Sequence, residues 1–375
     1  MISWKIPSLT PPPAPKPPRF IRWLFIMIMM GAIGFALGLY LSINEMLSPT
    51  INNTMLIVVF ALCPALLTGL IRLFIYSLAS YRHQLFTDML DDARQKWRHW
   101  ASKHLGLLTH ARLTHIDEKK KEDGPLSSLT PNKDNILKLE KLTSCFLWEK
   151  QEKVVRKLLT PIAEYYHQYN LTVPLTLYWQ AEDQESDWKA LIQQEAVHLS
   201  LPIDTVEILP YASFSEWLLA LYENPFEPKV YAILAFQLAE TASEEATSLL
   251  LAPQEFYEQL KAPIKAKLLR PIATERDAFA DALKTQCEFQ LSGPQLTALW
   301  HSNVSEGDKG EYIPRYIQQN INCLSEHFYD SNVFLGIGGL ARHSVTLSLA
   351  SEALIPALII YQNGNNLLLQ QITRE

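Results

Sequence analysis

VFLGIGGLARHSVTLSLASEALIPALIIYQNGN, residues 333–365, carries the pattern that decides the fold of the larger part of this chain. A short apolar strand, residues 333–335, is followed by three glycines and a helix over residues 344–354. Residues 357–361 and 367–372 are then two apolar strands around Asn363-Gly364-Asn365, a typical hairpin turn. This succession predicts an α/β domain whose strands are buried by helices.

The same alternation extends back to about Leu139. We expect strands over residues 173–179, 205–209, 230–236, 247–251 and 267–271. We expect helices over residues 146–169, 187–199, 216–222, 274–284, 295–301 and 313–329. The sequence shows no internal repeat. Residues 139–375 are therefore predicted to form one α/β domain, a mixed sheet layered with helices.

The N-terminal part is a predicted two-helix transmembrane anchor, residues 23–80. Residues 23–43 are uncharged and mostly apolar, and a second apolar run over residues 55–79 is interrupted only by Arg72. Each run is long enough for a hydrocarbon core of about 30 Å. The first run is too long for a signal peptide and lacks a small-residue cleavage site, so we expect it to stay in the protein.

The charges around the two runs predict their orientation. Positive residues precede the first run and follow the second, whereas residues 44–54 contain no Lys or Arg. Because positive residues mark the cytoplasmic side, we expect a multi-pass inner-membrane protein with both termini in the cytoplasm. The positive residues concerned are Lys5, Lys16, Arg19, Arg22, Arg82, Arg94, Lys96, Arg98 and Lys103.

Two segments flank this anchor. Residues 1–22 are a proline-rich tail containing PPPAPKPP, which is either a solvated spacer or a ligand for a proline-reading partner. Residues 81–138 are predicted as an amphipathic neck helix over residues 84–105, then a charged flexible linker over residues 115–134. The neck helix either lies on the membrane surface or continues the second span and packs on the head.

Charge and cysteine content exclude several classes of function. Residues 1–139 carry 16 Lys and Arg against 9 Asp and Glu, whereas residues 140–375 carry 17 against 30. An acidic head would be repelled by nucleic acid, so we expect no nucleic-acid partner. The four cysteines form no C-x-x-C pair, and His104, His110 and His115 share no helix face, so we expect neither a disulfide framework nor a metal site.

The stretch from Val333 to Asn365 resembles the C-terminal half of the thiolase-like, β-ketoacyl-synthase fold. In that family a strand leads into a Gly-His-x-Gly-x-Ala turn, a buried helix and two strands. Here the turn contains Gly336, Gly338 and Gly339, and Ile337 stands where the family carries a catalytic histidine. The segment ATSLLLAP, residues 246–253, is similar to the family's strand of small residues. The resemblance covers about the last 150 residues.

That family's chemistry needs a cysteine thiolate on a strained turn, assisted by histidines. Cys287 and Cys323 lie outside any glycine-rich turn and are interpreted as packed apolar residues. Catalytic residues, cofactor and metal ligands are therefore not expected, and the head is predicted to be non-enzymatic.

One loop is a candidate for binding an anion or a partner. Gly336, Gly338 and Gly339 lie between a strand and a helix, where backbone N–H groups can cradle a phosphate, and Arg342, His343 and Ser344 follow. The alternative is that the small residues let helix and sheet pack closely. The acidic stretch of residues 181–188 is similarly either a metal site or a solvated loop that starts a helix.

A two-span anchor before a degenerate thiolase-like head resembles membrane-linked accessory proteins of type VI secretion gene clusters, such as the lipase adaptor family. The resemblance implies an adaptor or chaperone that binds a toxin effector or a secretion-apparatus protein and contacts the lipid bilayer through residues 23–80. The alternatives are a membrane-tethered enzyme acting on an acyl or nucleotide substrate through residues 336–344, and an oligomeric scaffold.

Overall fold

The computed structural model describes residues 2–7, 10–43, 53–119, 131–142, 146–182, 187–224, 226–321, 323, 327–353 and 355–374. The predicted outer loop, most of the predicted linker, Cys145 and the middle of the acidic stretch lie outside these residues. The chain forms two compact units. The anchor unit is Pro7–Lys96, and the head unit is Met1–Ile6 together with Trp97–Glu375.

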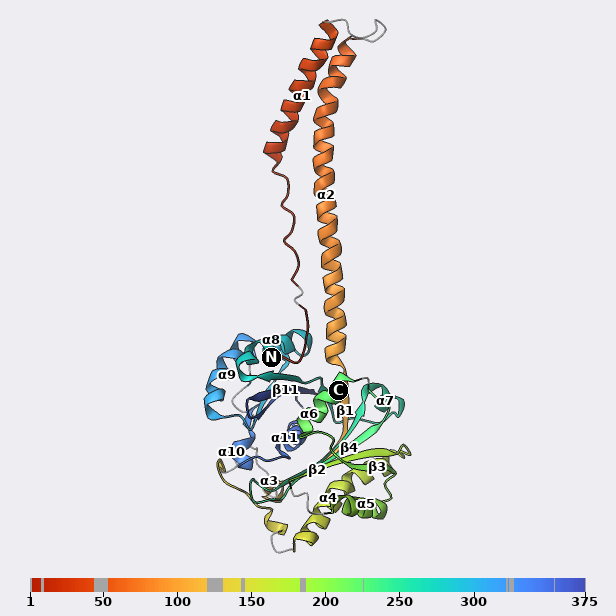
Figure 1. Ribbon diagram of the computed structural model, residues 1–375, viewed down its shortest axis with the longest axis vertical. Helices are drawn as coiled ribbons and strands as arrows, with labels where there is room; N and C mark the ends of the chain where they lie inside the picture. The colour runs from red at the N-terminus through yellow and green to blue at the C-terminus, as the bar shows by residue number, and fades with distance from the viewer. Residues whose placement is uncertain are drawn as a thin grey trace. The chain divides into compact units, whose positions relative to one another are not determined.

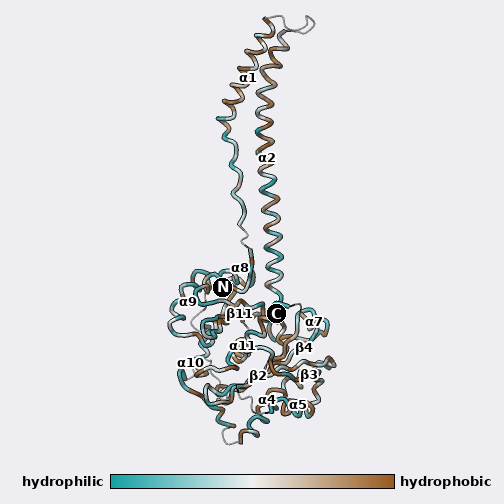
Figure 2. The backbone as a smooth tube through the Cα atoms, viewed as in Figure 1, coloured by the Kyte–Doolittle hydropathy of each residue, from teal (hydrophilic) through white to brown (hydrophobic). Residues whose placement is uncertain are grey.

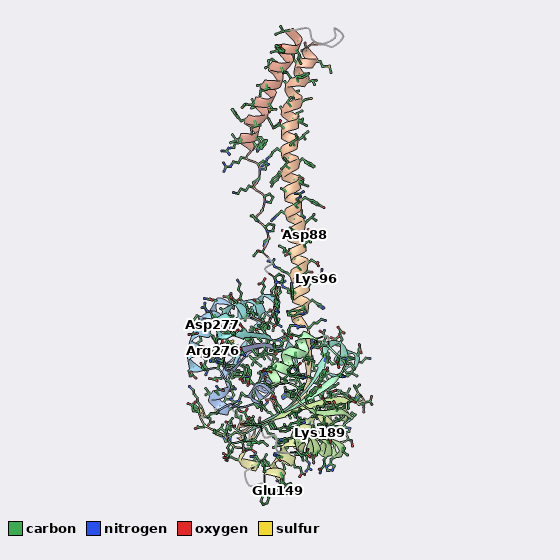
Figure 3. The ribbon with its side chains drawn as sticks, in the orientation of Figure 1. Asp88, Lys96, Glu149, Lys189, Arg276 and Asp277 are labelled. Atoms are coloured by element: carbon green, nitrogen blue, oxygen red, sulfur yellow. The ribbon has the colours of Figure 1, made fainter. Side chains whose placement is uncertain are left out.

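The anchor unit consists of α1 (Phe20–Ile43) and most of α2 (Asn53–Ser102) (Figure 1). Both helices are long and apolar enough to cross a membrane. Figure 2 shows hydrophobic residues along α1 and the first half of α2, whereas the second half carries charged residues such as Asp88 and Lys96 (Figure 3). The helices pack closely at Gly34, where a side chain would collide with the carbonyl oxygen of Phe60.

The head unit is built on one mixed 11-stranded sheet with the order β3-β2-β4-β5-β1-β6-β11-β10-β8-β9, and β7 pairs with β11. The strands of its first half are β1 (His104–Leu113), β2 (Leu175–Ala181), β3 (Ile203–Ile208), β4 (Val230–Gln237) and β5 (Glu245–Pro253). Those of its second half are β6 (Ala266–Leu269), β7 (Ile272–Glu275), β8 (Ala298–Ser302), β9 (Phe328–Asp330), β10 (Ala357–Asn363) and β11 (Asn366–Thr373).

The strand order repeats itself about the centre of the sheet. From the outer edge of the sheet inward, the four successive strand pairs of each half are parallel, parallel, antiparallel and antiparallel. The two halves meet where β1 pairs antiparallel with β6. The first half therefore maps onto the second by a pseudo-twofold rotation. No sequence repeat accompanies this structural repeat, because a buried strand requires only an apolar composition.

Helices cover the sheet in layers (Figure 1). In the first half, α4 (Leu147–Gln168) and α5 (Trp188–His198) share one core with β2, β4 and β5. Two central helices, α6 (Phe214–Glu223) and α11 (Arg342–Glu352), share a second core that crosses both halves. The shorter or outer helices are α3 (His115–Lys119), α7 (Gln254–Gln259), α8 (Phe279–Phe289), α9 (Glu306–Gln318) and α10 (Ser331–Leu335).

Most predicted elements of the head are present, but four predictions differ from the structure. Residues 295–301 were expected to be helical, yet they contain most of β8, and residues 333–335 belong to α10 instead of a strand. The helix expected from residue 274 begins at Phe279, after β7 and a 3₁₀ turn. The helix expected to reach residue 329 ends at Gln318. Short apolar runs do not distinguish strand from helix by periodicity, and the pairing partner decides.

The predicted boundary of the head at Leu139 is wrong. The predicted neck helix ends at Ser102, and the following residues form β1, which pairs with β5 on one side and β6 on the other. The head unit thus begins at Trp97, apart from the residues contributed by the N-terminus. The sequence of β1, HLGLLTHARL, alternates poorly because residues on both faces of a central strand are buried.

Candidate functional site

The predicted anion loop is a tightly packed turn between α10 and α11. Gly336 ends α10 with a φ of +72°, a conformation that glycine adopts without strain. A side chain at Gly339 would collide with Gln237, whose amide oxygen accepts a hydrogen bond of 3.0 Å from the Leu340 N–H. The glycines therefore serve close packing, the structural alternative considered for this loop.

Arg342 is fully buried, and the protein itself uses all three guanidinium nitrogens. Nε donates to the Glu245 carboxylate at 3.0 Å, and Nη2 donates to the same carboxylate at 2.5 Å. Nη1 donates to Asn332 Oδ1 and to the Gly336 carbonyl, each at 3.0 Å. Because Arg342 already has a carboxylate as its counter-ion, it has no free donor for a bound anion in this structure.

His343, the next residue of α11, also lies in the core. It is 1% exposed, its ring stacks on Tyr361 with centroids 4.7 Å apart, and Phe214 lies at 5.2 Å. Neither ring nitrogen has a hydrogen-bond partner among the described residues. Burial lowers the pKa of His343 to about 3, so its imidazole is neutral at pH 7.

Phe214 is the first residue of α6, where Ser213 caps the helix by accepting a hydrogen bond from the Glu216 N–H. The three rings of Phe214, His343 and Tyr361 fill the space between the starts of the two central helices. We call these three residues the aromatic plug. Ser344, the last residue of the predicted loop, is buried and donates to the Ala341 carbonyl at 2.8 Å.

The described cysteines do not form a nucleophilic centre. Cys287 lies on α8, and burial raises the pKa of Cys287 and of Cys323 to about 11. A thiol with such a pKa is protonated and unreactive at pH 7. Cys63 lies within α2. The described rings that pack against His343 are those of Phe214 and Tyr361, and neither carries a thiol.

Three further histidines have structural partners. His110 is on β1 and hydrogen-bonds Ser348 of α11 at 2.8 Å. His104 pairs with the Tyr257 hydroxyl at 2.8 Å, and His301 pairs with the Tyr316 hydroxyl at 2.7 Å. Among the described residues, no group of three or more His, Cys, Asp or Glu is placed to hold a metal ion.

Glu182 and Asp187, near the two ends of the acidic stretch, make hydrogen bonds that stabilise the fold. Glu182, after β2, accepts hydrogen bonds from Gln237 and from the Thr241 hydroxyl, and Asp187 caps α5 by accepting from the Ala190 N–H at 3.1 Å. The residues between them lie outside the described chain.

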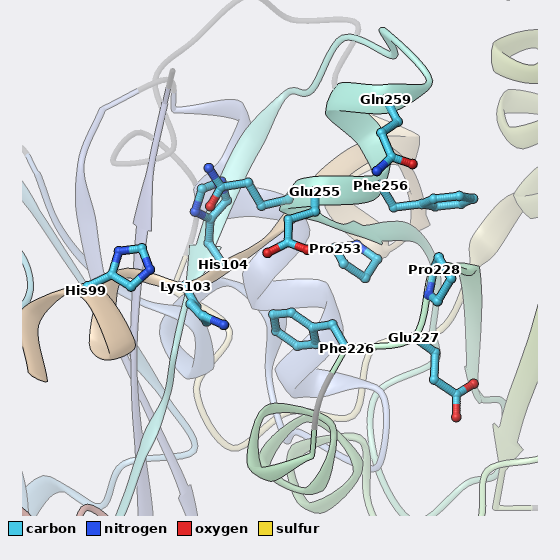
Figure 4. Close-up of a pocket in the computed structure, with 11 residues that line it drawn as sticks. His99, Lys103, His104, Phe226, Glu227, Pro228, Pro253, Glu255, Phe256 and Gln259 are labelled. Carbon is cyan, nitrogen blue, oxygen red and sulfur yellow. The ribbon is translucent and has the colours of Figure 1, made fainter. Parts of the chain in front are cut away.

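Surface pockets of the head unit were not evident from sequence. One of about 500 Å³ borders Gly336, Ile337 and Gly338, but its Lys133 and Lys309 both pair with Glu306 at 2.8 Å. Another, of about 430 Å³, lies where α2, β1 and α7 meet (Figure 4). Its wall combines Phe226 and Phe256 with Lys103 and Glu255. These residues are far apart in the sequence, so no local pattern announces the pocket.

Comparison with known proteins gives the fold of the head. No family model and no curated protein matches this chain. Solved structures similar to it include the oxazolomycin ketosynthase domain from Streptomyces albus JA3453, with 11% identity and a TM-score of 0.50, covering 73% of this chain and 96% of that chain. A type II PKS complex of an acyl-carrier protein and its ketosynthase bound to the hexaketide matches with the same identity, TM-score and share of this chain, covering 100% of that chain.

At this identity the likeness establishes the fold alone. The chain therefore combines two long apolar N-terminal helices with a thiolase-like ketosynthase fold. The fold is the one predicted from residues 333–365, and the helices are those predicted from the two apolar runs.

Proposed function

We propose that this protein is a membrane-tethered adaptor whose thiolase-like head binds a protein and performs no covalent chemistry. The aromatic plug is the observation that carries the proposal. His343 is packed between Phe214 and Tyr361, neither of its ring nitrogens has a hydrogen-bond partner among the described residues, and the neighbouring Arg342 is paired with Glu245. A condensing reaction would need an accessible thiolate and an imidazole within hydrogen-bond reach of each other.

The partner we propose is a toxin effector or an apparatus protein of a type VI secretion system. The resemblance of the anchored, degenerate head to accessory proteins of such systems motivates this choice. The bilayer would be contacted through residues 23–80, and the acidic head disfavours nucleic acid.

We also propose the cytoplasmic side of a bacterial inner membrane for both termini. In addition to the charge pattern, the N-terminal residues support this arrangement. Ser3 and Trp4 pack on the head, and both apolar helices lie between them and the head in the chain. If both helices span the membrane, the N-terminus and the head must lie on the same side.

A pull-down of the affinity-tagged full chain from crosslinked membranes tests the adaptor proposal. We expect it to recover a secretion component or a toxin, and a tagged chain that lacks both apolar helices, residues 20–80, and so misses the membrane serves as the control. Recovery of neither class of protein would contradict the proposal. The rival is an enzyme that acts on an acyl or nucleotide ester, and it would be supported if the purified chain hydrolysed such an ester and His343→Phe abolished the turnover.

A further inference from the structure

The N-terminal residues Ile2–Ile6 belong to the head unit and contact β7; we call them the N-terminal strap, and the surface that they cover the groove along β7. Ser3 pairs with the outer edge of β7: its N–H donates to the Ala273 carbonyl at 2.8 Å, and its hydroxyl oxygen accepts from the Ala273 N–H at 2.9 Å. The opposite edge of β7 pairs with β11. Ser3 therefore uses the free edge of β7 through one backbone and one side-chain hydrogen bond, the kind of edge that a peptide pairs with in strand addition.

Trp4 anchors the strap and is only 7% exposed. Its indole N–H donates to the Pro271 carbonyl at 2.9 Å, and its ring meets the edge of Trp100 with centroids 5.3 Å apart. The Arg270 guanidinium lies 4.0 Å from the centroid of Trp100 and so fixes the ring that Trp4 contacts. Trp4 is the one aromatic residue in residues 1–19, and it is the signal of this contact in the sequence.

Acidic residues surround the strap beyond its anchor. Ile2, Ser3 and Lys5 line a pocket of about 400 Å³ together with Glu216, Glu223 and Glu275. Tyr361 of the aromatic plug also lines it. The pocket thus favours a positive residue immediately after the aromatic anchor, as the chain's own Trp4-Lys5 provides.

From these contacts we infer that the groove along β7 is a docking site for an extended peptide of a partner protein, with a tryptophan followed by a basic residue. The strap is a resident pseudo-ligand that shows the chemistry the groove accepts. It is held by one aromatic side chain and a few hydrogen bonds, and the residues that follow it, 10–19, are mostly exposed. Segments with so few buried contacts open at low free-energy cost.

This inference rests on the proposed function in one respect, because the partner that supplies the peptide would be the protein the adaptor binds. Peptide binding is nevertheless measurable without that partner. Failure of peptide binding leaves the adaptor proposal intact, and an empty pull-down leaves the docking site intact.

The test uses the full chain in detergent and a fluorescent peptide of residues 2–7, ISWKIP, followed by fluorescence anisotropy. Trp4→Ala in the full chain should empty the groove, so this variant should bind the peptide saturably and at least tenfold more tightly than the wild-type chain does. A peptide with alanine in place of its tryptophan should bind neither. Equal binding to both chains, or none to Trp4→Ala, would overturn the inference.

Two further variants show where the peptide binds. Adding Ala273→Pro to Trp4→Ala removes the N–H that Ser3 uses, and should abolish binding. Because this change could disturb β7, the exposed Glu223→Lys provides a milder alternative. In the Trp4→Ala chain, Glu223→Lys should weaken the binding of ISWKIP and strengthen the binding of a peptide with glutamate in place of lysine. An unchanged preference between the two peptides would contradict binding in the groove.

Discussion

Glu244 and Glu245 are consecutive residues at the start of β5, and each binds a buried cation from a different part of the head. Glu244 pairs with Lys150 of α4 at 2.6 Å, and Glu245 pairs with Arg342 of α11 at 2.5 Å. Because neighbouring strand residues point to opposite faces, the two pairs join an outer helix and a central helix to the same strand. These carboxylates hold the layers in register, which gives the arginine of the predicted anion loop a structural role.

Glu245→Gln is expected to destabilise the protein strongly, because it leaves the Arg342 charge buried and unpaired. Breaking one partner of a buried pair costs about 3–5 kcal/mol. Thermal and denaturant unfolding of the detergent-solubilised chain would measure it. Glu240→Gln, which breaks the exposed pair with Lys138, is the matched control and should change the stability little. Similar stabilities for both variants would contradict this role of Glu245.

His343 makes the stability of the head depend on pH. Burial lowers its folded pKa to about 3 from 6.5, so the unfolded chain binds the additional proton between these values. Stability should therefore be full above about pH 6.5 and fall as the pH decreases toward 3. The loss from this group should reach about 2 kcal/mol at pH 5.

The pH effect is measured by comparing unfolding free energies of wild-type and His343→Phe chains from pH 7 to pH 5. The variant keeps a ring between Phe214 and Tyr361 but cannot titrate, so its decline should be shallower. His110 and His301, whose pKa values burial also lowers, continue to titrate in both chains and contribute to the remaining slope. Parallel curves would show that His343 does not contribute.

At the scale of elements, β1 is the strand that joins the two halves of the sheet. It pairs with β5 over most of its length and with β6 over His104–Leu107. It directly follows α2, so the element that leaves the anchor enters the centre of the head sheet. The pseudo-twofold repeat depends on this strand, because β1 and β6 form the contact between the halves.

A truncated chain beginning at Leu139 is therefore expected to misfold, because it lacks the strand that pairs with β5 and β6. A chain beginning at Trp97 retains every strand and should be soluble and unfold cooperatively. Expression of both fragments followed by circular dichroism and thermal unfolding makes the comparison. If residues 139–375 fold as well as residues 97–375, the central role of β1 is wrong.

At the scale of the whole molecule, the charge pattern and the contacts of the N-terminus both bear on the membrane topology. The proposed arrangement places residues 44–52 on the outer side and the head inside. In a chain whose native cysteines are replaced, Ser48→Cys should react with an impermeant maleimide in spheroplasts. Lys189→Cys, on the exposed surface of α5 (Figure 3), should react only after lysis. The reverse pattern would contradict the proposed orientation.

Sequence alone determined the two apolar helices, the acidic head, and most strands and helices between Leu139 and the C-terminus. These features are local: hydrophobic length, charge distribution and periodicity each depend on residues close together in the chain. The hairpin at Asn363-Gly364-Asn365 is an example, since β10 and β11 meet there as predicted. The same local evidence singled out Arg342 and His343, but it did not distinguish a binding loop from a buried turn.

Only the tertiary structure decided the place of β1, the pseudo-twofold repeat, the partners of Arg342 and His343, and the position of Trp4. Each depends on residues distant in the chain, such as Arg342 with Glu245 or Trp4 with Pro271. The free energy of a buried charge or ring depends on which groups surround it after folding. A sequence pattern states which residues are available for such contacts, whereas the packed layers determine which of them meet.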